Sequence, residues 1–341
     1  MPSTPAPIPN ILLVRFSSIG DVLLTTPLLR ALRRRHPEAR ITMLTKRAYA
    51  PLLEDNPHLS EILALEPDQS LPSLAAELRA SGFSHLLDLH DSLRSRILRA
   101  LVPGAWRGYP KYRAARALLI HGKRDRYPVH LPVAERYFDA ARGLDVRPDG
   151  DPPDFFLGTR AVAEAEAWMA GTRLGVSRRL AAVAPGAAHA TKQWPVEHWR
   201  MLVDRIVAAG MDVAVVGGSG DALVAEQVAA GRGDRSVSAA GRLGLQGTGA
   251  LLRRARAVVS GDTGVMHMAT GVGTPVIALF GPTVEAFGFF PYSRRAEVLQ
   301  LDLACRPCSS QGGPRCPLGH HHCLTQLDAA TVYQAVRRSV A

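Results

Sequence analysis

Short apolar runs alternate with amphipathic segments along the first half of the chain. The strand-like runs lie at residues 11–16, 40–44 and 85–89. Helices are predicted at residues 22–35, 75–80 and 92–101. The runs suit a parallel sheet with both faces covered, and residues 22–35 place leucines on one side before ending in three arginines. This β-α-β order predicts a doubly wound α/β domain.

The same order restarts in the second half. Strands are predicted at residues 180–184, 212–216, 237–239, 257–260 and 275–280. Helices are predicted at residues 196–209, 222–230, 245–254 and 264–270. The turn-rich segment 149–153 marks an approaching boundary, and the helical segment 160–174 is placed last before a hinge. We therefore expect a flexible N-terminus at 1–10, two Rossmann-like domains at 11–175 and 176–327, and a C-terminal helix at 328–341.

Each half contains a strand that ends in a polar turn before a helix. The first strand continues into Ser17-Ser-Ile-Gly-Asp21, and the strand ending near Val259 continues into Ser260-Gly-Asp-Thr-Gly-Val-Met-His267. Free amides and the positive dipole end at such a helix start can hold a diphosphate. Two such turns predict a cleft between two nucleotide-binding-type domains.

Charge narrows the class of partner. The 341 residues are 47% hydrophobic and 21% charged, which is typical of a globular protein with a sizeable core. The formal net charge of +11 favours a polyanion: nucleic acid, anionic lipid or a phosphorylated sugar. Aromatic residues make up only 6% and do not interleave with basic runs. Nucleic acid is therefore the weaker interpretation.

The N-terminus carries no pattern of an export signal. Residues 1–10 are proline-rich and uncharged, and the longest charge-free stretch, 263–284, is interrupted by proline, glycine and histidine. We expect a cytoplasmic protein whose four cysteines stay reduced and whose membrane contact is peripheral.

Three sequence blocks, in order, resemble glycosyltransferase family nine, the lipopolysaccharide heptosyltransferases. They are Arg15-Phe-Ser-Ser-Ile-Gly-Asp-Val22, then Ala184-Pro-Gly-Ala with Lys192-Gln-Trp-Pro-Val-Glu-His-Trp199, and 259–269 through Gly281-Pro-Thr283. The resemblance covers roughly residues 11–327. It implies a GT-B fold, two Rossmann-like domains facing across a cleft. It also implies an ADP-sugar donor in the C-terminal domain and a lipid A–inner-core acceptor in the N-terminal one.

The resemblance assigns catalysis to two residues. Asp21 is expected to be the general base of an inverting transfer, acting opposite the departing diphosphate. From position alone, its place in the first helical turn equally suits a capping role. Lys192 is expected to stabilise charge on the leaving diphosphate, whereas a lone lysine is otherwise a solvated surface charge.

The donor site is expected in the C-terminal domain. Its candidate residues are Thr191, Lys192, Asp221, Asp262, Thr263, Gly264, Val265 and His267. Asp262 is equally well explained as a helix N-cap, and His267 as a core histidine. Asp221 stands where enterobacterial family members carry a ribose-binding glutamate. Its loop, Gly217-Gly-Ser-Gly-Asp221, lacks the full dinucleotide fingerprint, so NAD binding ranks low.

The acceptor site is expected in the N-terminal domain. Its candidate residues are Ser18, Gly20, His90, Arg94, Lys111 and Arg113. His90 and Arg94 follow a strand, at the end of the sheet where ligands bind. The segment 107–126 is rich in basic residues suited to carboxylates and phosphates, although charges beyond a strand are often only solvated.

Four cysteines gather near the C-terminus at Cys305, Cys308, Cys316 and Cys323. Their spacing matches no common zinc module. We expect a structural or redox-labile segment at 305–323, with zinc as a minority hypothesis and no cofactor for transfer.

The sequence thus predicts an inverting, metal-independent glycosyltransferase that moves heptose from ADP-heptose to the lipopolysaccharide inner core. We expect a monomer, peripherally associated with the cytosolic face of the inner membrane, that binds no nucleic acid. One rival is the same fold with another nucleotide sugar or glycan acceptor. A non-catalytic nucleic-acid-binding protein would account for the charge but leave the Asp21 and Asp262 motifs unexplained.

Overall fold

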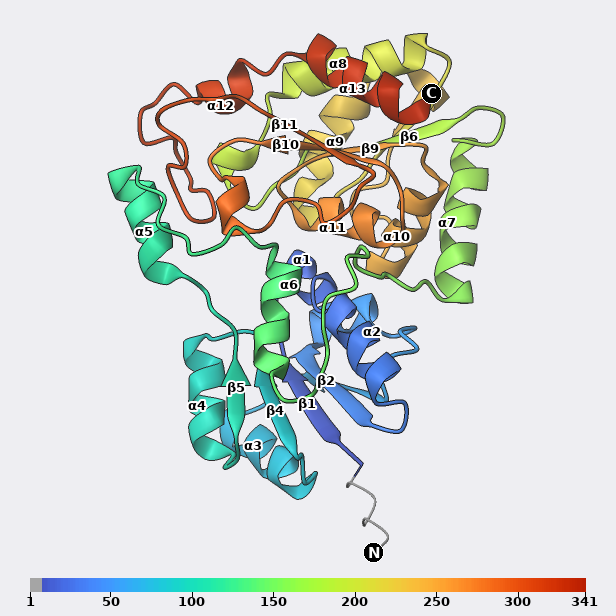
Figure 1. Cartoon of the computed structure of the whole chain (residues 1–341). Helices are drawn as coiled ribbons and strands as arrows, with labels where there is room; N and C mark the ends of the chain where they lie inside the picture. The colour runs from blue at the N-terminus through green and yellow to red at the C-terminus, as the bar shows by residue number, and fades with distance from the viewer. Residues whose placement is uncertain (1–7) are drawn as a thin grey trace, which may run out of the picture. The chain divides into compact units, whose positions relative to one another are not determined.

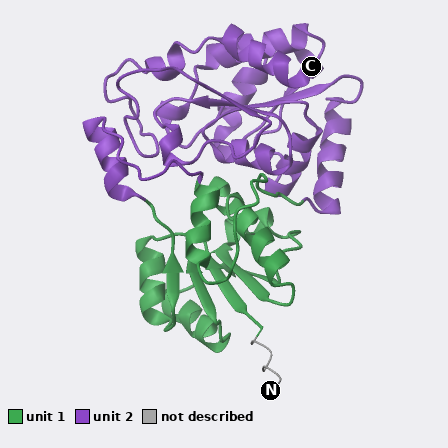
Figure 2. Ribbon diagram, in the orientation of Figure 1, with its two compact units in different colours: residues 1–111, 133–156 green, residues 112–132, 157–341 purple. Residues whose placement is uncertain are grey.

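The computed structural model describes residues 8–341, so most of the expected flexible N-terminus lies outside the described residues. The chain forms two compact units (Figure 2). Unit 1 contains the described residues up to 111 together with 133–156. Unit 2 contains 112–132 and 157–341. Both units are α/β, as predicted.

Unit 1 is built on a five-stranded parallel sheet (Figure 1). Its strands are β1 (Asn10–Val14), β2 (Arg40–Lys46), β3 (Glu61–Leu65), β4 (His85–Asp88) and β5 (Trp106–Gly108). The order is β3-β2-β1-β4-β5, and β1 pairs in parallel with both β2 and β4. Strand order therefore reverses between β1 and β4, which is where open α/β sheets bind ligands.

The helices of unit 1 follow the predicted pattern with one correction. They are α1 (Ile19–Leu23), α2 (Thr26–Arg35), α3 (Leu71–Ala80), α4 (Leu93–Leu101) and α6 (Val133–Arg136). The single helix predicted over 22–35 is wrong, because Pro27 has no N–H to continue α1 and lies instead in the first turn of α2. The hydroxyls of Thr25 and Thr26 bond to the carbonyls of Val22 and Leu23, each at 2.7 Å, and so close α1.

The core of unit 1 is formed by strand side chains that point alternately to the two faces of its sheet. Leu12 and Val14 point to the face that packs against Leu74, Leu78 and Leu98 of α3 and α4. Ile11 and Leu13 point to the other face and are also fully buried. A sheet covered on both sides explains why its strands are continuous apolar runs.

Unit 2 contains a six-stranded parallel sheet of the same winding. Its strands are β6 (Leu180–Ala184), β7 (Asp212–Val215), β8 (Ser236–Ser238), β9 (Val258–Gly261), β10 (Val276–Phe280) and β11 (Ala296–Gln300). The order β11-β10-β9-β6-β7-β8 reverses between β6 and β9. Both units therefore have the Rossmann strand order, which confirms the predicted fold class.

The helices of unit 2 enclose a separate core. They are α5 (Arg113–Gly122), α7 (Thr159–Thr172), α8 (Val196–Ala208), α9 (Ala222–Ala229), α10 (Leu245–Arg254), α11 (Gly264–Gly271), α12 (His322–Thr325) and α13 (Ala329–Val340). Trp199 of α8 and Val332 of α13 are buried with Val183 of β6 and Ile277 of β10. The predicted C-terminal helix is thus an integral part of this core. Within residues 8–341, no helix is long and apolar enough to cross a membrane.

The sequence predicted that the domains divide after residue 175. The two observed units divide differently, in two respects. Helix α7 belongs to unit 2, where it packs against α10 and Glu164 accepts a hydrogen bond from the Gly244 amide at 3.2 Å. The segment 112–132 also belongs to unit 2, because Tyr127 packs with Ala286 and Phe287. The turn-rich segment at 149–153 is closer to the true boundary, since Asp149 binds Arg30 of unit 1 at 2.8 Å.

Candidate active site

In unit 1, Asp21 lies beside the reversal of strand order. Arg15 is the residue after β1, and its guanidinium forms an ion pair with the Asp21 carboxylate. Ser18 donates to the same carboxylate from its hydroxyl at 2.9 Å and from its amide at 3.2 Å. The hydrogen bond from the Ser18 backbone amide is the helix-capping contact. Asp21 therefore caps α1, and its carboxylate is held in a fixed position.

Arg15 is buried and links the two strands that flank the reversal. Its Nε donates to the Ser17 carbonyl at 2.8 Å and its Nη1 to the Leu89 carbonyl, beyond β4, at 2.6 Å. Its guanidinium also lies 5.9 Å from the centre of the buried Tyr137 ring. These contacts fix the cation, and the cation in turn fixes the Asp21 carboxylate.

The environment keeps Asp21 ionised. Burial alone would raise its pKa, but the charge of Arg15 and the hydrogen bonds from Ser18 outweigh burial and lower the pKa. The side chain remains 15% exposed, so the carboxylate is charged and reachable. It can accept a proton, although Arg15 makes it a weaker base than a free carboxylate.

Two of the expected acceptor residues meet near this carboxylate. The His90 ring packs edge-on against Phe16, with ring centres 5.4 Å apart. Lys111 donates to the carbonyls of His90 and Asp91. Burial, and then the charges of Arg15 and Lys111, lower the pKa of His90 to about 4. The imidazole is therefore neutral at pH 7, and its Nδ1 has no hydrogen-bond partner in the described chain.

The remaining acceptor candidates are dispersed. Ser18 and Gly20 lie in the turn and helix that carry Asp21. Arg94 is exposed in the first turn of α4. Arg113 begins α5 and therefore belongs to unit 2, not to the N-terminal domain as expected. The basic segment 107–126 is divided between the two units.

In unit 2, the reversal of strand order brings Lys192 and Asp262 together. Lys192 lies in the loop after β6, and Asp262 follows β9 directly. The Lys192 ammonium is 2.7 Å from Asp262 Oδ2, and the Thr283 hydroxyl donates to the same oxygen at 2.8 Å. Both charged side chains are mostly buried. A cation, an acid and a hydroxyl from three loops thus form one polar cluster, the donor cluster.

The N-terminus of α11 lies next to the donor cluster. Thr263 is the N-cap residue in an extended conformation, and its hydroxyl contacts the Ser260 hydroxyl at 3.0 Å instead of capping the helix. The first helical residues are Gly264 and Val265, whose amides have no acceptor within the helix. Gly261 lets this loop pack closely, because a Cβ atom would lie 3.2 Å from the Lys192 carbonyl.

Three other donor candidates already have structural roles. The Thr191 hydroxyl accepts a hydrogen bond from the Gly313 amide at 2.8 Å and so holds the cysteine-rich segment. His267 is buried within α11. The Asp221 carboxylate accepts from the Gly218 amide at 2.9 Å and covers Gly186, where a Cβ atom would lie 2.1 Å from it. Asp221 therefore packs against the loop that leads to Lys192.

All four cysteines are free thiols. Burial, followed by the other thiols, raises the pKa of Cys323 to about 11, and the pKa of Cys308 is raised for the same reasons. Across residues 8–341, no three cysteine, histidine or acidic side chains are grouped closely enough to hold a metal ion.

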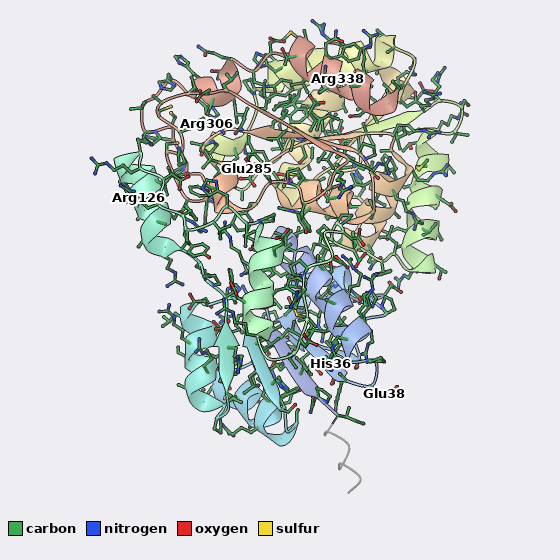
Figure 3. The ribbon with its side chains drawn as sticks, in the orientation of Figure 1. His36, Glu38, Arg126, Glu285, Arg306 and Arg338 are labelled. Carbon is green, nitrogen blue, oxygen red and sulfur yellow. The ribbon has the colours of Figure 1, made fainter. Side chains whose placement is uncertain are left out.

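Sequence reasoning missed three residues, of which one pairs with Asp21 and two lie at or beside the donor cluster. Arg15 and Thr283 stand within the family motifs, but no role was predicted for either. Arg306, labelled in Figure 3, donates to the carbonyl of Gly281 and to that of Thr283, the latter at 2.8 Å. For Arg15 and Thr283, the available signal was their place at the first and last positions of the sequence blocks that resemble the family.

The family assignment follows from comparison with known proteins. The family model for glycosyltransferase family 9 (heptosyltransferase) matches residues 71–317 of the 341. The chain belongs to this family. It is therefore a glycosyltransferase, as the motifs predicted, and the rival hypothesis of a non-catalytic nucleic-acid-binding protein loses its support.

Individual relatives agree with this assignment. The chain is 27% identical to lipopolysaccharide heptosyltransferase 2 of Escherichia coli K12 over 86% of its own length and 88% of the relative. It is 28% identical to lipopolysaccharide heptosyltransferase 1 of Pseudomonas aeruginosa over 88% and 86%. The solved ADP-heptose heptosyltransferase II of E. coli superposes with a TM-score of 0.75 at 22% identity, covering 97% and 98% of the two chains. That likeness confirms the GT-B fold class.

Proposed function

We propose that this glycosyltransferase moves heptose from ADP-heptose to the inner core of lipopolysaccharide, with inversion at the anomeric carbon. The observation that carries the proposal is the Lys192–Asp262 pair beside the start of α11. The Lys192 ammonium and the free amides at the start of α11 are donors suited to a diphosphate, and they lie at a switch point of the sheet. The relatives of the chain are named lipopolysaccharide heptosyltransferases.

Positive charge and free amides in unit 2 suit the diphosphate of the donor. Lys192 and the amides of Gly264 and Val265 would bind the diphosphate, and the Thr263 hydroxyl would add a hydrogen bond. Charge develops on ADP as the glycosidic bond breaks, so a fixed ammonium stabilises the transition state more than the ground state. Because Lys192 supplies this charge, we propose that transfer needs no divalent metal. Asp262 holds the ammonium in place until the donor binds.

The acceptor side follows from the Asp21 carboxylate. We propose that it removes the proton from the acceptor hydroxyl as that oxygen attacks the anomeric carbon. Ser18, Gly20 and His90 would line the acceptor, with His90 contributing hydrogen bonds and not charge. Arg94 and Lys111 would bind its carboxylates and phosphates. The enzyme would act as a monomer at the cytosolic face of the inner membrane.

A transfer assay tests the proposal. The enzyme is offered ADP-heptose and other nucleotide sugars with a series of truncated lipopolysaccharide acceptors, and products are identified by mass spectrometry. We expect heptose transfer from ADP-heptose alone. Preferred use of another nucleotide sugar would support the second candidate, in which the same fold serves a different glycan.

A further inference from the structure

An arginine-lined hollow of about 510 Å³ lies on the surface of unit 2. Its lining includes five arginines, namely Arg178, Arg179, Arg253, Arg254 and Arg256. No lining residue is acidic or aromatic. We call this surface the arginine hollow.

The arginine hollow lies at the edge of the sheet opposite the donor cluster. Leu180 begins β6, and its carbonyl accepts from the amide of Arg256, just before β9, at 2.8 Å. Lys192 and Asp262 follow the other ends of the same two strands. Strands of this length span roughly 15 Å, so one ligand of ordinary size cannot occupy both sites.

Most of the charge in the hollow is not neutralised by the protein. Arg178 lies 3.8 Å from Asp212, whose carboxylate also binds Arg235 at 2.7 Å. The other four arginine side chains are exposed and have no hydrogen bond or ion pair to any of residues 8–341. The C-terminal dipole of α10 favours Arg253 and Arg254, but it does not account for the two arginines of the other lining segment, 175–180. Such a cluster is typical of an anion-binding surface.

Apolar side chains accompany the arginines. Val176, in the loop that lines the hollow, is 66% exposed. Arg179 also lines a second hollow of about 720 Å³ with Tyr333 and Val340 of α13. Arg338, which is labelled in Figure 3 and lines this second hollow, is paired with Glu297 at 2.6 Å. Arginines beside an exposed valine and a tyrosine suit the boundary between lipid headgroups and acyl chains.

We propose that this face of unit 2 docks onto an anionic lipid bilayer. The arginines would contact lipid phosphates, and Val176 would enter the headgroup layer. The absence of an aromatic residue among those lining the arginine hollow disfavours a nucleic acid, which would need a stacking platform. The sequence predicted peripheral membrane contact but assigned the basic segment 107–126 to the acceptor, so the surface proposed here is a different one. Docking of this kind does not depend on which sugar or acceptor the enzyme uses.

Vesicle co-sedimentation of the full chain tests the proposal. The probe is a mixed phosphatidylglycerol–phosphatidylcholine vesicle, with pure phosphatidylcholine as the neutral reference. The triple variant Arg179→Gln, Arg253→Gln, Arg256→Gln should bind the anionic vesicles on the order of 10²-fold more weakly. Each arginine near an anionic membrane surface strengthens binding by about fivefold, and three such factors multiply. Val176→Ser should lose affinity several-fold.

A matched control removes the same charge elsewhere. Arg160, Arg200 and Arg242 are exposed arginines of unit 2 outside both hollows. Replacing all three with glutamine should leave vesicle binding within about threefold of wild type, because the local charge density of the docking face is kept. Equal losses in both triple variants, or none in either, would overturn the proposal.

Two further measurements distinguish membrane docking from a small-anion site and from a folding defect. Saturable binding of inorganic pyrophosphate to the arginine hollow, without vesicle binding, would show a small-anion site and overturn membrane docking. Glycosyl transfer to a water-soluble acceptor fragment should be unchanged in the hollow variant, which also shows that it folds. Failure of heptose transfer with intact vesicle binding would refute the proposed function and leave membrane docking standing.

Discussion

The ammonium of Lys192 lies 2.7 Å from the carboxylate of Asp262, although the two residues follow different strands and are 70 positions apart in the chain. Thr283 donates to the same carboxylate oxygen. The cation is therefore oriented before a donor arrives, which lowers the cost of ordering a long side chain on binding. An incoming diphosphate would share the ammonium with Asp262.

Replacing Lys192 with alanine should weaken ADP binding by roughly 10- to 100-fold, the usual value of one charge-assisted contact. Transfer should slow by at least as much, because no ammonium then stabilises the negative charge that develops on the departing ADP. Calorimetric titration with ADP measures the first effect. Arg200→Ala, which removes an exposed cation elsewhere in unit 2, is the control and should bind ADP normally. Unchanged ADP affinity in Lys192→Ala would remove this residue from the donor site.

Replacing Asp21 with asparagine should lower turnover on the order of 10² to 10⁴-fold, the usual contribution of a positioned base. Asparagine retains an oxygen for the bonds from Ser18, so the helix cap and ADP affinity should persist. Steady-state kinetics with a saturating donor give the result. Near-normal turnover would mean that Asp21 only caps α1.

The ion pair with Arg15 predicts a pH dependence. In the folded protein the pKa of Asp21 is lowered, so its carboxylate is stabilising above the unfolded-state pKa near 4, and this contribution is lost as pH falls through the folded pKa. Arg15→Gln removes the charge that outweighs burial, so the pKa of Asp21 should rise. The acidic limb of kcat/KM should then move about 1–3 units towards higher pH.

Arg15→Lys provides the control for that shift, because it keeps the charge and should restore much of the wild-type profile. A general loss of folding in Arg15→Gln would lower the rate equally at every pH. That pattern, with no movement of the acidic limb, would contradict electrostatic control of Asp21 by Arg15.

The division of the basic segment between the two units makes a further prediction. Arg94 and Lys111 belong to unit 1 with Asp21, whereas Arg113 belongs to unit 2. Replacing Arg94 with alanine should raise the acceptor KM several-fold, because a charge-assisted contact is lost, and leave ADP affinity unchanged. Lys111→Ala should act similarly but also loosen the His90 loop. Loss of ADP binding in Arg94→Ala would contradict the assigned role.

Chelation should leave transfer intact. Because Lys192 and the α11 amides are proposed to meet the leaving-group charge, the rate in excess EDTA should match the untreated rate. Metal analysis of the purified protein, with a variant replacing Cys305 and Cys308 by serine, checks the cysteine-rich segment separately. A rate that falls with EDTA and recovers with zinc would restore the minority hypothesis.

Much of the fold could be predicted because buried parallel strands leave a direct trace in sequence. Strands β1, β2, β4, β6, β7, β9 and β10 were located closely from apolar runs. Strands β3, β5 and β11 were missed because they are partly exposed and, in the case of β5, only three residues long. The break between α1 and α2 could have been predicted from Pro27, but the leucines on both sides keep a helical period, and the two helices were therefore predicted as one.

The candidate site divides in the same way. Motifs identified Asp21, Lys192 and Asp262, because a polar turn after a buried strand must lie at the ligand-binding edge of a sheet. They did not reveal that Thr191 holds Gly313, that Arg113 lies in unit 2, or that Asp221 packs over Gly186. Those contacts join segments distant in the chain, and one sequence carries no signal of such pairing.

The sequence by itself determined two Rossmann-like domains, the family and the turns that carry chemistry, because hydrophobic period and glycine placement act locally. Only the tertiary structure decided which charges meet. Strand order sets the neighbours of each loop end, so it brings Lys192 to Asp262 and Arg15 to the Leu89 carbonyl beyond β4. The ion pair of Arg15 with Asp21 lies within one strand–turn–helix segment, and the local fold of that turn forms it. Strand order also gathers arginines from two segments into one hollow, since the N-terminal ends of β6 and β9 share an edge of the sheet.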